Sequence, residues 1–265
     1  MWRAGFMTLC VLGFLGGTDA PQPVVEDQSF QATLDQTEQR YVALTPPEVT
    51  SPIDVLIALH GHGSDRWQFI KAERDECRAA RDAALQRGML YVSPDYRATT
   101  SWMGPAAEAD LVQLIAILKK ERSVRHVYLC GGSMGGTAAL TFAALHSDLI
   151  QGVASMNGTA NLVEYENFQD AIRASFGGDK QTVPDEYRKR SAELQFEALR
   201  MPVGLTTGGQ DTAVPPASVL RLAEKLKSLD RKVLLIHREA GGHETNYEDA
   251  TRILDFVLPP KAASN

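Results

Sequence analysis

The feature that most limits the fold is a serine set among glycines where a strand runs into a helix. The apolar run 127–130 leads directly into GGSMGG at residues 131–136, and a helical pattern continues to Leu145. A chain that turns from strand to helix so abruptly forces its central residue, Ser133, into strained backbone beside which side chains would collide. With 21 glycines in the chain, the pattern alone could arise by chance, but the flanking strand and helix argue against that. They predict a serine hydroxyl held out above a sheet edge as a nucleophile.

A serine hydroxyl needs a base that takes its proton and an acid that orients the base. Of six histidines, His243 lies in the glycine-containing loop 240–244, between the last predicted strand and the last predicted helix. Asp211 follows the preceding predicted strand. Taken alone, Asp211 would be interpreted as a helix cap. The chain order Ser133, Asp211, His243 is the order that accompanies this nucleophile turn, and it predicts these three as catalytic residues.

The oxyanion of an acyl-transfer reaction needs two backbone N–H donors. One normally comes from the residue after the nucleophile, here Met134, and the other from the loop after an early strand. That loop is HGHG at residues 60–63, in which we expect His62 to donate, with Gly63 as the alternative. These histidines have no partner at the spacing of a zinc site, so we expect neither metal nor cofactor.

The loop 95–104 follows a predicted strand and should lie on the same face as the nucleophile. Tyr96 and Trp102 carry rings that can stack on a sugar or aryl group, and Arg97 can meet a carboxylate. The alternative for Trp102 is that it anchors the loop against the core. Asn157, at the tip of the strand after the nucleophile helix, is expected to hydrogen-bond around the site. We count these four residues and Gly63 as candidate substrate-binding residues.

Short apolar runs alternate with amphipathic stretches along the chain, as in strand, crossover helix and parallel strand. The pattern predicts an α/β fold with a doubly wound, mostly parallel eight-stranded sheet and helices on both faces. The expected strands are 28–34, 39–44, 53–59, 89–93, 127–130, 152–156, 202–207 and 232–237. The expected helices are 66–86, 106–121, 134–145, 215–229 and 245–257.

Residues 159–199 fit this rhythm poorly and are expected to form a short helical excursion over the active site, too small for a full lid. With 265 residues, 44% of them hydrophobic, the chain can bury one core, so residues 21–265 are expected to form a single catalytic domain. A net charge of −6 leaves no basic field for nucleic acid or an anionic membrane. The cluster 188–190 of two arginines and a lysine is expected to be a solvated helix face.

The first twenty residues combine Arg3, an apolar run over 6–15 and small residues at 18–20. This is typical of a secretory signal peptide, with an uncleaved anchor as the alternative, so we expect a secreted or periplasmic protein with no membrane attachment after cleavage. The mature chain would keep Cys77 and Cys130. We expect two separate packed thiols, although an exported protein permits a disulfide.

Residues 60–63, 131–135, 209–211 and 242–243 together resemble the α/β-hydrolase superfamily, over nearly the whole mature chain. The loop 95–111 and the small excursion resemble stand-alone esterases related to the catalytic domain of prolyl oligopeptidases and to dienelactone hydrolases. A dienelactone hydrolase carries cysteine as its nucleophile, whereas Ser133 stands here. The propeller domain of those peptidases has no counterpart in this sequence.

The resemblance implies a serine carboxylic ester hydrolase that acts through an acyl-enzyme on a small-molecule or saccharide ester. The only candidate cover, 159–199, is rich in charged residues, so we expect short acyl groups of about two to four carbons, because longer chains would gain nothing from burial. A serine peptidase of the prolyl-oligopeptidase type and an acyltransferase use the same residues and are the alternatives. The alternative outside enzymes is a binding protein on the same fold.

Overall fold

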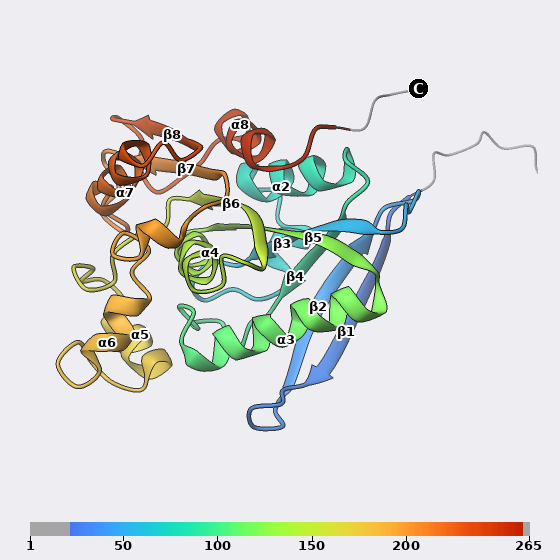
Figure 1. Cartoon of the computed structure of the whole chain (residues 1–265), viewed down its shortest axis with the longest axis horizontal. Coiled ribbons are helices and arrows are strands. Elements are labelled where there is room, and N and C mark those ends of the chain that lie inside the picture. The colour runs from blue at the N-terminus through green and yellow to red at the C-terminus, as the bar shows by residue number, and fades with distance from the viewer. Residues whose placement is uncertain (1–21, 262–265) are drawn as a thin grey trace, which may run out of the picture.

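The structure, a computed structural model, describes residues 22–261 and contains one eight-stranded sheet in that range (Figure 1). The spatial order of the strands is β1-β2-β4-β3-β5-β6-β7-β8. β2 pairs antiparallel with both β1 and β4, and all other neighbours are parallel. The strands are β1 Val24–Gln31, β2 Glu38–Thr45, β3 Ile53–Leu59, β4 Leu90–Pro94, β5 Val124–Gly132, β6 Ile150–Met156, β7 Val203–Gly208 and β8 Val233–Arg238. The doubly wound, mostly parallel sheet predicted from the sequence is confirmed.

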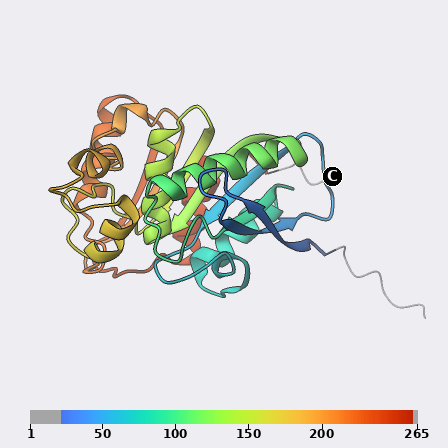
Figure 2. The same ribbon diagram turned by 90° about the horizontal axis from the view of Figure 1, so that it is seen from below.

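Helices cover both faces of this sheet, and Figure 2 shows α3 and α4 on the face opposite α2. One hydrophobic core lies under α3, α4 and α7, and includes Leu111, Phe142 and Leu222. The other lies under α2 and α8, and includes Ala80 and Ile253. The helices are α1 Gln68–Lys71, α2 Asp75–Leu85, α3 Pro105–Glu121, α4 Met134–Leu145, α5 Gln169–Phe176, α6 Pro184–Lys189, α7 Ala217–Ser228 and α8 Tyr247–Val257, with a 3₁₀ turn η1 at Phe196–Ala198.

Three expectations about the elements and the surface need correction. The strand expected over 28–34 begins earlier, and β1 ends at Gln31 because residues 33–35 form the turn to β2. The single helix expected over 66–86 is divided into α1 and α2, because Arg74 adopts an extended conformation with ψ 143°. The basic cluster 188–190 is not wholly solvated. The side chain of Arg190 is 0% exposed, and its guanidinium donates to Glu108, Glu186 and the Met103 carbonyl. A buried arginine is stable only when its charge and donors are matched in this way.

The segment 159–199 carries α5, α6 and η1 and lies beside the end of the sheet in Figure 1. Arg190 ties it to α3 through Glu108, at 2.7 Å. Burial by itself would raise the pKa of Glu108. Hydrogen bonds from His146 and Arg190, together with the charge of Arg190, outweigh that and lower the pKa to about 2. The excursion is therefore fixed to the body of the fold by a buried ionic network.

Cys77 and Cys130 are both free and buried, so the expectation of two separate thiols holds and the disulfide alternative is wrong. Burial raises the pKa of Cys77 to about 12 and that of Cys130 as well, which keeps both thiols protonated. The expected signal peptide falls on residues 1–20, outside the described residues. Within residues 22–261, no helix has the length and apolar character needed to span a bilayer.

Candidate active site

Ser133 lies in the turn between β5 and α4, with φ 57° and ψ −121°, a conformation that side-chain-bearing residues rarely adopt. Its N–H donates to the Met156 carbonyl at 2.8 Å, which ties the turn to β6. A Cβ added to Gly135 would overlap the Leu59 carbonyl at the end of β3. The backbone of α4 thus approaches the sheet as closely as glycine permits, and the serine is held above the carboxyl ends of the central strands.

The structure brings the three expected catalytic side chains into one hydrogen-bonded line. His243 Nε2 lies 2.9 Å from Ser133 Oγ, and His243 Nδ1 lies 2.7 Å from Asp211 Oδ2. The Asp211 side chain is 0% exposed, whereas His243 is 31% exposed. Both distances suit proton transfer between hydrogen-bonded groups. A base reachable from solvent and an acid shielded from it is the arrangement that activates a serine hydroxyl.

Backbone and side-chain groups hold the acid and the base in place. Asp211 Oδ1 accepts the N–H groups of Ala213 and Val214, at 3.0 and 2.8 Å, which leaves Oδ2 for the histidine. Asn157 is 4% exposed and donates from Nδ2 to the Gly242 carbonyl, next to His243. Asn157 therefore supports the base loop as a hydrogen-bonding residue around the site, and it lines a small hollow beside Ser133 and His243.

The two expected oxyanion donors lie next to the serine, since Met134 follows it in the chain and His62 lines the same cavity. Met134 is the first residue of α4, where a backbone N–H has no partner within the helix. The Gly63 N–H donates to the Thr99 carbonyl at 2.8 Å and is thus engaged, whereas none of the hydrogen bonds of the described residues uses the N–H of His62. Between the two alternatives, His62 is the residue whose N–H stays available.

The loop 95–104 supports the oxyanion loop from behind, contrary to the expected substrate-facing rim. Tyr96 is 2% exposed and its hydroxyl donates to the His60 carbonyl, while Trp102 is 1% exposed and its indole N–H donates to His62 Nδ1 at 3.1 Å. Burial lowers the pKa of His62, so its ring stays neutral and keeps Nδ1 as an acceptor. The anchoring alternative for Trp102 is the one that the structure matches.

Arg97 does not present a free cation to a substrate. Its guanidinium is bound to Asp35 at 2.7 Å and to Asp110 at 2.8 Å. Tyr96, Arg97, Trp102 and Met103 all have positive φ, a strained backbone that persists only where many contacts fix it. These contacts turn the side chains inward. No sequence pattern predicts that inward direction.

A cavity of about 250 Å³ opens beside Ser133 and His243. Its walls come from the oxyanion loop, from the α1–α2 region and from residue 168 of the excursion. Sequence reasoning missed the residues Gln68, Phe69, Arg74, Glu76, Phe168 and Ala213. Arg74 Nε lies 2.7 Å from Glu76 Oε1, so this wall carries a paired charge. Only the break between α1 and α2, which the helical pattern hides, brings that pair to the site.

Nothing in the described part of the chain suggests a metal centre, since no group of three or more His, Cys, Asp or Glu side chains in residues 22–261 is arranged to hold an ion. The described groups around Ser133 are a nucleophilic hydroxyl, a base, an acid and backbone N–H donors.

Comparison with known proteins places these features in a family. The family model described as "Prolyl oligopeptidase family" matches residues 79–258, which include Ser133, Asp211 and His243. A relative named "Uncharacterized peptidase YtmA", from Bacillus subtilis (strain 168), is 27% identical over 158 residues, which make up 56% of this chain and 62% of that protein. The chain thus spans less than two thirds of that relative's length.

Solved structures share the fold at low identity. An S-formylglutathione hydrolase from Agrobacterium tumefaciens has a TM-score of 0.69 and 17% identity, and covers 91% of this chain and 95% of its own. A ferulic acid esterase has a TM-score of 0.66 and 16% identity, and covers 90% of this chain and 98% of its own. The solved structures share the fold, and the long match to the family model gives the assignment: the chain belongs to the prolyl oligopeptidase family.

Proposed function

We propose that this chain is a secreted carboxylic ester hydrolase that works through an acyl-enzyme on short-acyl esters. The observation that carries the proposal is the hydrogen-bonded line of Ser133, His243 and Asp211 beside the unengaged N–H of His62. Ser133 Oγ attacks the ester carbonyl as His243 Nε2 takes its proton. Asp211 stabilises the resulting imidazolium, and the N–H groups of His62 and Met134 receive the oxyanion.

His243 then returns the proton to the leaving alcohol, and water repeats the cycle on the acyl-enzyme. The cavity beside Ser133 limits the acyl group. Its volume of about 250 Å³ lies below the usual range for drug-sized ligands, roughly 300–1,000 Å³. Phe69 and Phe168 supply its apolar surface and Arg74 its polar edge. Acyl groups of about two to four carbons fit beside these rings, and a longer chain would meet the paired charges of Arg74 and Glu76, where its further methylenes would gain little of the ~0.8 kcal/mol each that apolar burial gives.

Labelling and an acyl series test the proposal together. A fluorophosphonate probe should label the wild type at Ser133 and leave Ser133→Ala unlabelled. On p-nitrophenyl esters of rising acyl length, kcat/KM should be greatest at two to four carbons and Ser133→Ala should lose about a million-fold in kcat. An optimum at about eight carbons or more would contradict the short-acyl assignment.

Peptide hydrolysis is the second candidate, favoured by the matched family and by the printed name of the Bacillus subtilis relative. Chromogenic peptides in the same assay decide between the two, because a peptidase would cleave them with a kcat/KM above that for the acetyl ester. Secretion rests on the N-terminal pattern alone. Mass spectrometry of the protein from its native host should find a mature chain that starts near residue 21, whereas a retained Met1 together with a cytoplasmic location would contradict export.

A further inference from the structure

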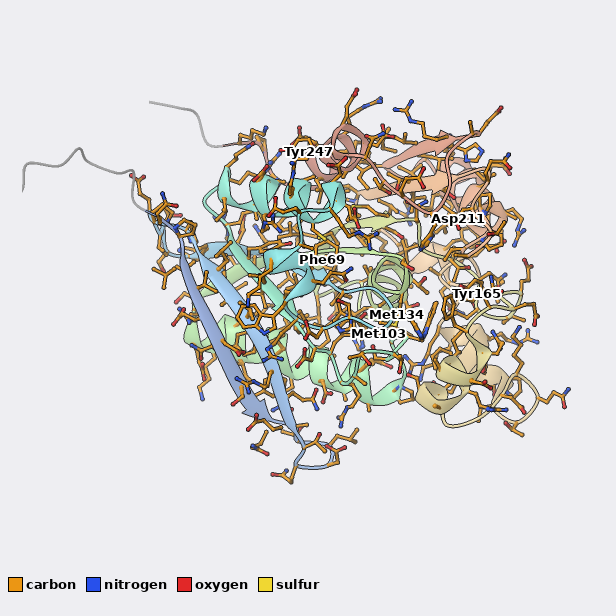
Figure 3. All side chains as sticks on the ribbon, turned by 180° about the vertical axis from the view of Figure 1, so that it is seen from behind. Phe69, Met103, Met134, Tyr165, Asp211 and Tyr247 are labelled. Atoms are coloured by element: carbon orange, nitrogen blue, oxygen red, sulfur yellow. The ribbon has the colours of Figure 1, made fainter. Side chains whose placement is uncertain are left out.

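A second cavity, of about 360 Å³, lies beyond the acid loop. It is bounded by the start of the excursion, by residues 164–167 and by the chain from Thr212 to the first turn of α7. In Figure 3 the labelled Tyr165 lies near Asp211, at the excursion end of the sheet. The Tyr165 hydroxyl donates to the Ala213 carbonyl at 2.8 Å. The cavity therefore adjoins the loop that carries the acid of the active site.

A thin ridge separates this cavity from the one beside Ser133. Asn167 lines the second cavity, whereas Phe168, the next residue, lines the first. In the same way Thr212 lines the second and Ala213 the first. Asn167 Nδ2 donates to the carbonyls of both Thr212 and Ala213, at 3.0 and 2.9 Å, and so closes the ridge. One extended ligand can cross the ridge and occupy both cavities.

The second cavity combines apolar surface with polar groups and carries no unpaired charge. Glu164 is paired with Arg221 at 2.5 Å and Glu166 with Lys180 at 2.7 Å. Among the neutral polar side chains of the lining, Thr159, Asn161 and Ser218 are buried and hydrogen-bonded within the protein. None of the hydrogen bonds of the described residues uses Asn167 Oδ1 or Thr212 Oγ1, and both residues are exposed. These two neutral groups, beside the apolar surface of Tyr165 and Pro215, suit a neutral ligand that carries both hydroxyl groups and apolar C–H faces.

We propose that this cavity is a subsite for a sugar unit of an oligosaccharide whose acyl ester, on a neighbouring unit, reaches Ser133. The proposal rests on the proposed ester hydrolase function. A peptide would be met by an exposed strand edge or by charges for its ends, and the lining offers the Asn167 amide oxygen and the Thr212 hydroxyl instead. An anionic ligand would face the carboxylates of Glu164 and Glu166. The cavity thus sets the alcohol side of the substrate.

Filling the cavity tests the subsite without touching the reacting groups. Ala217 is an exposed residue of the cavity wall on α7, so Ala217→Trp should occupy the space. Glu224→Trp adds the same bulk to an exposed position of that helix outside the lining, and is the matched control. For acetylated xylo-oligosaccharides, Ala217→Trp should lower kcat/KM about tenfold by raising KM. A tenfold loss corresponds to about one hydrogen bond between the sugar and the cavity. On p-nitrophenyl acetate both variants should stay within about twofold of the wild type.

An unchanged kcat/KM of Ala217→Trp on the acetylated xylo-oligosaccharides would overturn the subsite. So would an equal loss on both substrates, or a loss confined to chromogenic peptides. If the wild type hydrolyses no ester at all, the proposed function fails by itself. The subsite is then judged by calorimetry with unacetylated xylotetraose, which should bind the wild type and Glu224→Trp but not Ala217→Trp. No binding to the wild type would refute it.

Discussion

Replacing Arg190 by methionine should destabilise the protein far more than a surface arginine change would. The variant removes the donors to the Met103 carbonyl, Glu108 and Glu186, at 2.7, 2.7 and 2.9 Å, from a side chain that is 0% exposed. The drop in the pKa of Glu108 from 4.5 to about 2 corresponds to about 3 kcal/mol, shared with His146. Removing one partner of a buried ion pair costs about 3–5 kcal/mol.

The free energy of unfolding should therefore fall by about 3 kcal/mol, and Tm by roughly 6–12 °C for a protein of this size. Circular dichroism during heating at pH 7 measures the change in Tm. Arg188→Met, at an exposed position of α6, is the control and should shift Tm by less than about 2 °C. In Arg190→Met, the further change Glu108→Gln should recover part of the loss, because it removes the carboxylate left without its partner.

The same network predicts a pH dependence of stability. The pKa of Glu108 is lower in the folded protein, so its contribution is fully present above the ordinary value of 4.5 and is lost as the pH falls toward about 2. The difference in stability between the wild type and Arg190→Met should shrink over that interval. If Arg190→Met lost less than about 1 kcal/mol at pH 7, or if the difference were equal at pH 3 and pH 7, the assignment of a stabilising buried network would be refuted.

Three further predictions concern the reacting groups and the backbone around them. Asp211→Asn should keep the fold but lower kcat about ten-thousand-fold in ester assays, because the amide favours the wrong histidine tautomer, and nearly full activity would mean that another acid serves. Trp102→Phe removes the donor to His62 Nδ1 and should lower kcat about tenfold, a fraction of the cost of losing an oxyanion donor, with little change in KM. A large rise in KM with an unchanged kcat would point to a substrate contact instead. Gly135→Ala would drive a Cβ into the Leu59 carbonyl. It should lower the free energy of unfolding by at least ~1–3 kcal/mol and abolish labelling by the fluorophosphonate probe. A variant with wild-type Tm would contradict the close approach of α4 to the sheet.

The strands, most of the helices and the residues of the triad could be predicted from the amino-acid sequence. Each of these features produces a recognisable pattern among neighbouring residues. A strand covered on both faces is a short apolar run, and the nucleophile turn needs glycines within two residues of Ser133 because the backbones of α4 and the sheet nearly touch there. Asp211 and His243 could be found because parallel strands end at one edge of the sheet, so that loops far apart in sequence meet.

Which side chains face the active-site cavity depends on contacts that form only in the folded chain. Tyr96 and Trp102 stand in a loop of positive φ, and their direction is set by the His60 carbonyl and by His62, about 40 residues away in the chain. In sequence, Arg190 resembles its exposed neighbours. It is buried because its guanidinium binds the carboxylate of Glu108 on α3. Hydrophobic periodicity averages the burial of a segment over several residues. The direction of one polar side chain depends instead on partners that the fold brings from elsewhere.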